Sequence, residues 1–242
     1  TMATPWLCRP FEWGADLVVH STTKFLSGQG NAMGGIVIDS GRFPWFGNAK
    51  YPSLSEPCPD YNGLTFAETF GDMAFTLYSH AVSLRDLGCT QSPMNAWITL
   101  NGVETLPLRM ERHVENAQKV AGFLQQHPSV EWVSYAGLSS SPYYQLAQKY
   151  LQGKAGSVFT FGIRGGYESG LRLLEKVELF SHVSNIGDSR SLILHPASTT
   201  HRQLSDEQRL IAGAGPEVIR LSVGIESAED LIADLEQALE GL

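Results

Sequence analysis

Residues 20–35, HSTTKFLSGQGNAMGG, place two hydroxyl side chains and a lysine directly before a glycine-rich loop. The hydroxyls of Ser21 and Thr23 can donate hydrogen bonds to a phosphate. Lys24 can form a Schiff base with a carbonyl compound when its amine has lost a proton. Glycines such as Gly28 and Gly30 permit positive φ angles and a close approach of the backbone to a ligand. The order of these residues therefore suits covalent binding of a phosphorylated carbonyl compound.

Two other interpretations of this segment stay open on spacing alone. A lysine that follows Ser-Thr-Thr is most often a solvated surface residue, and the glycines then form an ordinary loop. Ser21 and Lys24 also match the S-x-x-K pattern of penicillin-binding proteins and β-lactamases, in which the serine is acylated. That pattern opens a helix and is accompanied by a K-T-G triplet. Here the segment follows an apolar run that reads as a strand, and the chain contains no K-T-G triplet.

Other polar residues carry weaker signals. His195, Ser198 and His201 lie in HPASTTH, where the spacing is not that of a helical metal pair and no Cys or carboxylate is close by. We therefore expect no metal site there, and we assign these residues to the shape of a loop. Arg220 lies in a strand-like run, and on the residues alone a salt bridge at the strand end is its favoured role.

Short elements must position the lysine. Residues 16–20 (DLVVH) and 35–39 (GIVID) predict two buried strands, with residues 21–34 as the loop between them. Such apolar runs are typical of a mostly parallel sheet that is covered on both faces. Ligands in open α/β sheets bind beyond the carboxyl ends of the strands, which is where Lys24 falls.

The rest of the chain differs from this segment in composition and in the spacing of its apolar residues. Residues 40–71 are rich in Pro, Gly and aromatic residues and predict an irregular, locally packed insertion, and residues 72–87 have helical spacing. Ser92 as N-cap and Pro93 as first residue open a long helix, interrupted near Pro107. Beyond it, we predict strands at 130–134, 157–163, 179–183 and 218–223, and helices at 167–176 and 227–239, the latter with a capping-box pattern of Ser227 and Asp230. This order predicts a small α+β domain, with the boundary near Gln91–Ser92.

Composition excludes several classes of protein. The chain has 242 residues and a formal net charge of −8, without a run of basic residues, which argues against a nucleic-acid partner. No stretch approaches the roughly 20 apolar residues that a membrane helix needs. Three scattered cysteines suit neither a disulfide framework nor a zinc site. The first residues lack the layout of a secretory signal, so we expect a cytoplasmic protein.

Several segments together resemble one enzyme family. ATPWLCRPFEWGADLVVHSTTKFLSGQGNAMGGIVIDSGRF is similar to the lysine segment of the Cys/Met-metabolism family of pyridoxal-phosphate (PLP) enzymes. LNGVETLPLRMERHVENA resembles the long helix of that family, SNIGDSRSLILHPASTTH its second signature, and IRLSVGIE its carboxylate-binding arginine strand. The resemblance implies an α/β, type I PLP-dependent transferase-like fold. Residues 1–91 would be the C-terminal part of the large PLP-binding domain, and residues 92–242 the connecting helix and a small C-terminal α+β domain.

The resemblance also implies residue roles. Lys24 would hold pyridoxal 5'-phosphate as a Schiff base and would then move protons on the substrate. Ser21 and Thr23 would bind the phosphate of the cofactor. Arg220 would bind the α-carboxylate of an amino-acid substrate, which its planar fork suits, and Asn185 would lie near that carboxylate.

The insertion at residues 40–71 resembles the O-acetylhomoserine sulfhydrylase branch. That branch implies γ-replacement of O-acetyl-L-homoserine with sulfide, giving L-homocysteine and acetate in methionine biosynthesis. Cystathionine γ-synthase, methionine γ-lyase and O-succinylhomoserine sulfhydrylase stay open as alternatives within the family, which includes trans-sulfuration enzymes. The family forms homotetramers built as dimers of dimers, so a homo-oligomer is expected.

The pattern of the family extends upstream of this chain. An Asp-Asn pair that precedes the segment starting at Thr1, the phosphate-cradling turn and several sheet strands are absent here. We therefore expect a C-terminal fragment that requires the missing N-terminal portion, or a second chain, for activity. A folded remnant that only assembles with partners is the non-enzymatic alternative.

Overall fold

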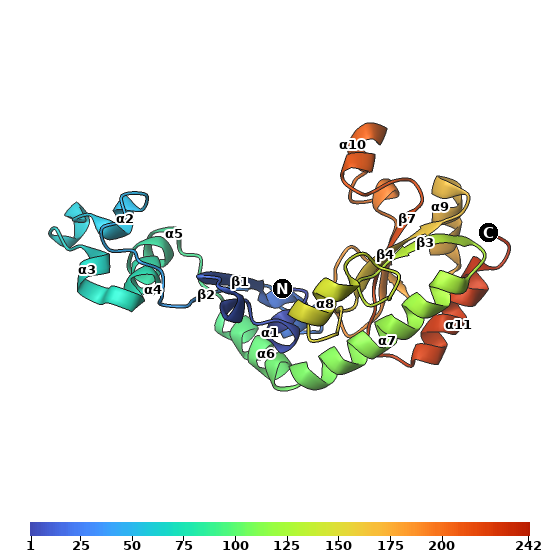
Figure 1. Ribbon diagram of the computed structural model, residues 1–242, viewed down its shortest axis with the longest axis horizontal. Helices are drawn as coiled ribbons and strands as arrows, with labels where there is room; N and C mark the ends of the chain where they lie inside the picture. The colour runs from blue at the N-terminus through green and yellow to red at the C-terminus, as the bar shows by residue number, and fades with distance from the viewer. The chain divides into compact units, whose positions relative to one another are not determined.

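The computed structural model describes residues 1–242, and its contacts divide the chain into two compact units (Figure 1). Unit 1 consists of Thr1–Cys8, Thr22–Met33 and Ile98–Leu242, and unit 2 of Arg9–Ser21 and Gly34–Trp97. The units interleave along the chain, so the boundary near Gln91–Ser92 stays a prediction.

The sheet of unit 2 consists of two strands, β1 (Leu17–Ser21) and β2 (Gly35–Asp39). Both predicted strands are confirmed, and they pair with each other antiparallel, whereas their apolar runs favour a mostly parallel sheet. The physical reason is the short connection, because parallel neighbours need a crossover that usually contains a full helix.

One face of this two-stranded sheet is exposed. Val19 and Val37 lie opposite each other on this face and are 65% and 55% exposed, whereas Val18 on the other face is buried. The prediction that both faces are covered is therefore wrong within this chain. Two strands with an uncovered apolar face are marginally stable by themselves, because too little apolar surface is removed from water.

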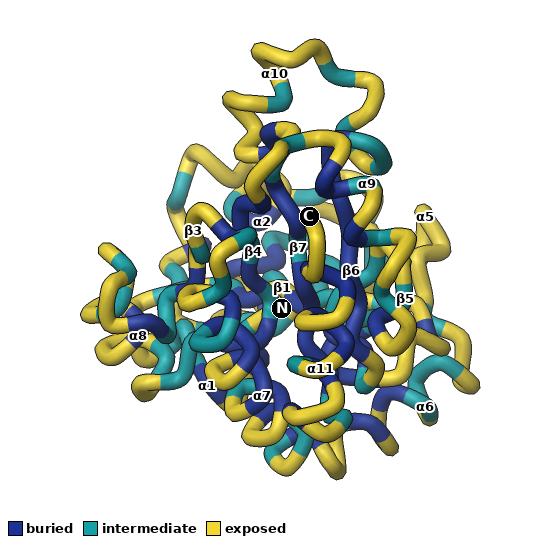
Figure 2. The backbone as a smooth tube through the Cα atoms, turned by 90° about the vertical axis from the view of Figure 1, so that its right-hand side faces the viewer, coloured by how far each residue is buried: buried dark blue, intermediate teal, exposed yellow.

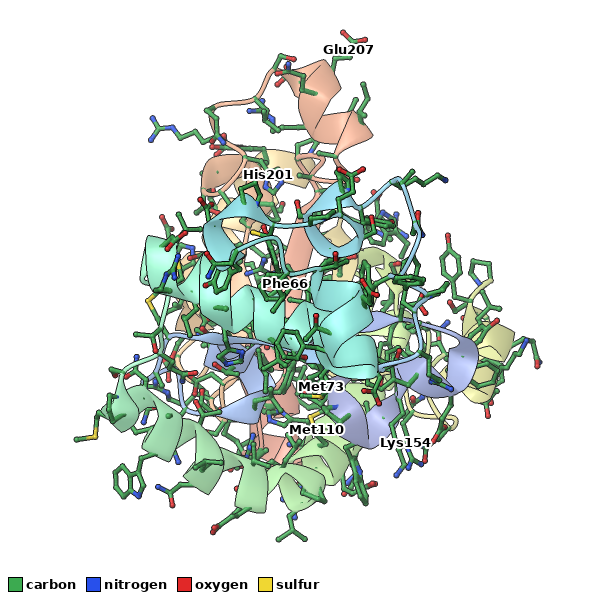
Figure 3. All side chains as sticks on the ribbon, turned by 90° about the vertical axis from the view of Figure 1, so that its left-hand side faces the viewer. Phe66, Met73, Met110, Lys154, His201 and Glu207 are labelled. Atoms are coloured by element: carbon green, nitrogen blue, oxygen red, sulfur yellow. The ribbon has the colours of Figure 1, made fainter.

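The aromatic insertion of unit 2 has a core of its own. The ring of Phe66, labelled in Figure 3, lies 5.1 Å from that of Tyr78, and Trp45 stacks on Phe75 at 5.6 Å. Aromatic pairs of this kind stabilise a loop beyond the area that they bury. The predicted local packing is thus confirmed. The short helices α2 (Pro52–Ser55), α3 (Phe66–Phe70) and α4 (Ala74–Tyr78) carry it, and α5 (Arg85–Leu87) follows outside this core.

The predicted long helix forms as two helices, α6 (Pro93–Glu104) and α7 (Leu106–Gln126). The Ser92 hydroxyl caps α6 by accepting a hydrogen bond from the Asn95 amide at 3.1 Å. The interruption falls at Thr105, and Pro107 lies in the first turn of α7, where a missing N–H costs nothing.

Unit 1 contains a mixed five-stranded sheet in the order β3-β4-β7-β6-β5. All neighbours are antiparallel except β5 and β6, as expected for an α+β domain. Figure 2 shows β4, β6 and β7 as the buried centre of this unit. The strands are β3 (Val130–Ser134), β4 (Val158–Ile163), β5 (Ser181–His182), β6 (Leu192–Leu194) and β7 (Val218–Ser222).

Helices supply the rest of the core of unit 1. Phe161 and Leu221 of the sheet share one buried cluster with Leu231 and Leu235 of the last helix. Asp234 of that helix accepts hydrogen bonds from the amides of Glu178, Leu179 and Phe180, at 2.8 to 3.0 Å. The remaining helices are α1 (Thr4–Leu7), α8 (Tyr144–Tyr150), α9 (Gly166–Lys176), α10 (Asp206–Ile211) and α11 (Ala228–Leu239).

Two helix starts differ in their caps. The Ser227 hydroxyl caps α11 by accepting from the Asp230 amide at 3.3 Å, as its sequence predicts. The full reciprocal capping box belongs instead to α10, between Ser205 and Gln208, which sequence reasoning missed. None of the helices is long and apolar enough to cross a bilayer.

Candidate functional site

Lys24 lies in a short helical stretch that is kinked at the lysine itself. The stretch covers Thr22–Leu26, and Lys24 leaves helical geometry with φ −91° and ψ −131°. Two backbone bonds close it: the Ser27 amide donates to the Thr22 carbonyl at 3.1 Å, and the Gly28 amide to the Lys24 carbonyl at 2.8 Å. We call residues 22–28 the lysine segment. Sequence predicts a loop here, and the structure shows a more ordered turn.

Asn185 connects Lys24 to Arg220 within unit 1. The amine of Lys24 donates a hydrogen bond to the side-chain carbonyl of Asn185. The backbone carbonyl of the same asparagine accepts a bond from Nη2 of Arg220 at 3.3 Å. Three residues that the sequence singles out are thereby brought together, although Lys24 and Asn185 are 161 positions apart.

Arg220 is half-buried and has no carboxylate partner. Its Nη2 group donates to the Ser184 carbonyl at 2.8 Å and to that of Asn185, and burial lowers the pKa of the guanidinium. The strand-end salt bridge favoured from the residues alone is therefore wrong. A desolvated guanidinium that binds only carbonyls keeps Nε and Nη1 for an anion, and a carboxylate matches their geometry.

The two hydroxyls of the predicted phosphate site fall in different units. Ser21 is the last residue of β1 in unit 2, whereas Thr23 belongs to the lysine segment in unit 1. Each is half-buried. Their role toward a phosphate stays a prediction. Between them in sequence, the hydroxyl of Thr22 is buried and has no hydrogen-bond partner.

The loop that carries Asn185 packs closely on the lysine segment. Gly187 has a φ of +75°, and a Cβ there would lie 2.8 Å from the Phe25 amide nitrogen. The Ser189 amide donates to the Gly28 carbonyl at 2.8 Å. A side chain at position 187 would push the two segments apart, so glycine is required by both the backbone angle and the contact.

His113 of α7 packs against Phe25 of the lysine segment. Its role was not identified from sequence. Its Nδ1 donates to the Val223 carbonyl at 2.7 Å, and its ring meets the edge of Phe25 at 5.2 Å. Nε2 has no partner, and the residue is fully buried. Burial lowers the pKa of His113 to about 4, against the opposing effect of its bond to Val223. The sequence does carry a signal for this residue, because His113 occupies a position of the helix that is otherwise apolar.

We expect His113 to make the stability of the chain depend on pH. The unfolded chain binds a proton to this residue near pH 6.5, but the folded chain binds it only near pH 4. As far as His113 is concerned, the free energy of unfolding is therefore at its maximum above about pH 6.5. It falls as the pH drops toward about 4, by about 3 kcal/mol at most. Urea unfolding of wild type and His113→Leu at both ends of this range measures it.

His113→Leu should flatten the pH dependence of the unfolding free energy between about pH 6.5 and about pH 4. Equal slopes in wild type and His113→Leu would contradict the assignment, whatever the stability of the variant at neutral pH.

The HPASTTH residues form a structural cluster. His195 is fully buried, its Nε2 donates to the Pro216 carbonyl at 2.8 Å, and its Nδ1 lies 3.0 Å from the Ser198 hydroxyl. The donation to Pro216 leaves Nδ1 as the acceptor of the serine hydroxyl proton. These bonds hold the loop after β6, as proposed for these residues. The structure gathers no group of three or more His, Cys, Asp or Glu side chains suited to a metal ion.

Comparisons with known proteins cover the whole chain. The family model for Cys/Met metabolism PLP-dependent enzymes matches residues 1–240. The O-acetyl-L-homoserine sulfhydrylase of Leptospira meyeri is 51% identical over 251 residues, covering 100% of this chain and 57% of that protein. O-acetyl-L-homoserine sulfhydrylase 1 of Thermus thermophilus is 50% identical, covering 97% of this chain and 55% of that protein. The chain thus spans slightly more than half the length of these relatives.

A solved structure resembles the chain over its full length. It belongs to a Campylobacter jejuni protein assigned as an O-acetylhomoserine (thiol)-lyase, with a TM-score of 0.95 and 43% identity. The match covers 100% of this chain and 57% of that protein, which carries a pyridoxyl-lysine phosphate.

Proposed function

Because this chain belongs to the Cys/Met metabolism family of PLP-dependent enzymes, we propose that it is the lysine-bearing part of an O-acetyl-L-homoserine sulfhydrylase. The reaction is replacement of the acetate of O-acetyl-L-homoserine by sulfide, which yields L-homocysteine. The connection from Lys24 through Asn185 to Arg220 carries this proposal.

The residues present fit one side of a PLP site. Lys24 offers an amine held by a neutral amide, and Ser21 and Thr23 offer hydroxyls for a phosphate. The buried hydroxyl of Thr22, which has no partner in this chain, is a further donor at the same segment. When bound, PLP supplies an electron sink that stabilises negative charge on the substrate carbons.

Lys24 is the proposed proton carrier. Its hydrogen bond to Asn185 fixes the direction of the side chain. A neutral amine accepts one proton at a time, so Lys24 would take the α-proton, pass it to the bound cofactor, and then take a β-proton. The protons would return to the substrate carbons after sulfide has replaced acetate at Cγ.

Arg220 and Asn185 are the proposed substrate-binding pair. Nη2 of Arg220 is used for two backbone carbonyls, which orients the guanidinium and leaves a pair of donors for the α-carboxylate. Asn185 takes part on both sides, because its side chain binds Lys24 and its backbone binds Arg220. The carboxylate and the proton acceptor are therefore positioned by one residue.

The choice of O-acetyl-L-homoserine rests on two observations. The aromatic insertion forms a core of its own, and several relatives at about half identity are O-acetyl-L-homoserine sulfhydrylases. Assays with O-acetyl- and O-succinyl-L-homoserine on the complete enzyme test this choice, and a preference for the succinyl ester would overturn it.

The first experiment is reductive trapping of the cofactor on the lysine. The chain is incubated with pyridoxal phosphate, reduced with borohydride and mapped by peptide mass. Label on Lys24 well above label on Lys119 or Lys154 supports the proposed site. Even labelling of all lysines means that this chain alone forms no PLP site. The proposed role of Lys24 would then apply only to the complete enzyme, in which the same trapping experiment tests it.

We expect the chain alone to show no sulfhydrylase turnover, and a complete enzyme to show it. The exposed apolar face of β1 and β2 and the length of the relatives support a missing N-terminal portion. Adding that portion should cover Val19 and Val37 and restore homocysteine formation. Turnover by the purified chain without it would contradict this expectation, whereas assembly without PLP binding would favour a non-enzymatic partner.

A further inference from the structure

Arg109 of α7 binds the backbone directly after Lys24. Its Nη1 donates to the Phe25 carbonyl at 2.9 Å, and its Nη2 to the Leu26 carbonyl at 3.4 Å. The same Nη2 donates to the Gly102 carbonyl at 2.6 Å. One guanidinium thus joins the lysine segment to the end of α6.

The orientation of this guanidinium is fixed from its own helix. Nε donates to the hydroxyl of Thr105 at 3.1 Å, and that hydroxyl in turn lies 3.3 Å from the Gly102 carbonyl. All these acceptors are carbonyls or a hydroxyl, and burial lowers the pKa of Arg109. The side chain is therefore held by dipoles and not by an ion pair.

The acceptors lie where a cation is favoured. The last carbonyls of a helical stretch have no partner inside it and carry partial negative charge. Phe25 and Leu26 end the helical stretch after Lys24, and Gly102 lies in the last turn of α6. Five N–H donors in a rigid plane can satisfy several such carbonyls at once, whereas an ammonium group is a single point.

Two glycines allow this close approach. A Cβ at Gly28, which has a φ of +77°, would clash with the guanidinium of Arg109. A Cβ at Gly102 would clash with the carbonyls of Leu26 and Ser27. The backbone of the lysine segment therefore meets α6 directly, with the guanidinium as the polar link.

We infer that Arg109 is a positioning residue, which fixes the lysine segment and thereby the place of the Lys24 amine. Asn185 holds the amine itself, while Arg109 holds the backbone from which the lysine extends. This inference rests on the proposed function for the role of Lys24, but the immobilisation of the segment stands without a cofactor.

Hydrogen exchange of the full chain tests the immobilisation. The amides of Ser27 and Gly28 report on the segment, and those of β7 report on the core of unit 1. Arg109→Met should raise exchange at the two reporter amides roughly tenfold or more and leave β7 unchanged. Arg112→Met, three residues along α7 and exposed, is the matched control and should change neither.

Two further variants separate the effect of the planar guanidinium geometry of Arg109 from the effect of its positive charge. Arg109→Lys should exchange as fast as Arg109→Met, because one ammonium cannot bind the carbonyls of Phe25, Leu26 and Gly102 together. Thr105→Val, which removes the hydroxyl that accepts from Nε and donates to the Gly102 carbonyl, should raise exchange by roughly two- to tenfold. This milder change decides the case if Arg109→Met does not fold.

The trapping experiment on the same variants links the segment to Lys24. Arg109→Met should lower the share of pyridoxyl label on Lys24 relative to Lys119 several-fold, and Arg112→Met should not. The inference is overturned if Arg109→Lys keeps the protection of the wild type, or if Arg109→Met raises exchange equally in β7. Wild type without selective label on Lys24 would mean that this chain alone forms no PLP site, while the exchange comparison would still decide the role of Arg109.

Discussion

Replacing Lys24 by alanine in the complete enzyme should abolish homocysteine formation, with a loss of at least about a thousandfold. Two roles disappear together, since the residue would bind the cofactor and carry protons, and proton transfer alone accounts for roughly 10²- to 10⁴-fold. Lys24→Arg should be equally inactive, because a guanidinium does not give up its proton at neutral pH. Turnover is measured as homocysteine released from O-acetyl-L-homoserine and sulfide.

The control for Lys24 is another lysine of unit 1. Lys119 is exposed and pairs with Glu115 at 3.0 Å on α7, so Lys119→Ala should keep nearly full turnover. Circular dichroism of each variant shows whether the fold is kept. If Lys24→Arg kept activity within tenfold of wild type, Lys24 would not be the proton carrier.

The second large effect should come from Arg220. Replacing it by alanine should lower kcat/KM for O-acetyl-L-homoserine roughly a hundredfold or more, mainly through KM. The reason is loss of the paired donors for the α-carboxylate, so Arg220→Lys should recover only part of the effect. Initial rates at varied ester and sulfide concentrations separate the two substrates.

The sulfide dependence is the internal control for this prediction. Sulfide carries no carboxylate, so its apparent KM should stay within about twofold in the Arg220 variants. Arg202→Ala, an exposed arginine whose side chain binds nothing in the structure, should leave both KM values unchanged. An equal rise of KM for ester and sulfide would mean that Arg220 supports the site as a whole and does not bind the carboxylate.

Local features of the fold were predictable from the sequence because their causes are local. The strand at Gly35–Asp39 has the bounds that its apolar run predicts, and Ser92 caps α6 as its place before Pro93 predicts. Apolar runs and capping side chains act over a few residues, so the chain carries their signal directly. The short strand β6 had no such signal, because three residues are too few for a periodic pattern.

The pairing direction of the strands and the burial of their faces were harder to predict from the sequence. The apolar runs of β1 and β2 predict buried members of a mostly parallel sheet, but the two strands form an antiparallel pair with an exposed face. An apolar run indicates a surface that requires cover, without indicating which segment covers it or whether that segment belongs to the same chain. The pairing direction depends on the path of the connection through space.

The sequence by itself determined the chemistry available to this protein: the lysine, the hydroxyls before it, and the arginine and asparagine that match a family pattern. Only the tertiary structure decided that Asn185 binds both Lys24 and Arg220, and that Arg109 holds a backbone 84 positions away. Contacts of this kind leave no periodic trace in the chain. They exist because the sheet of unit 1 and α7 bury a common apolar core, and the burial of that core brings distant loops together.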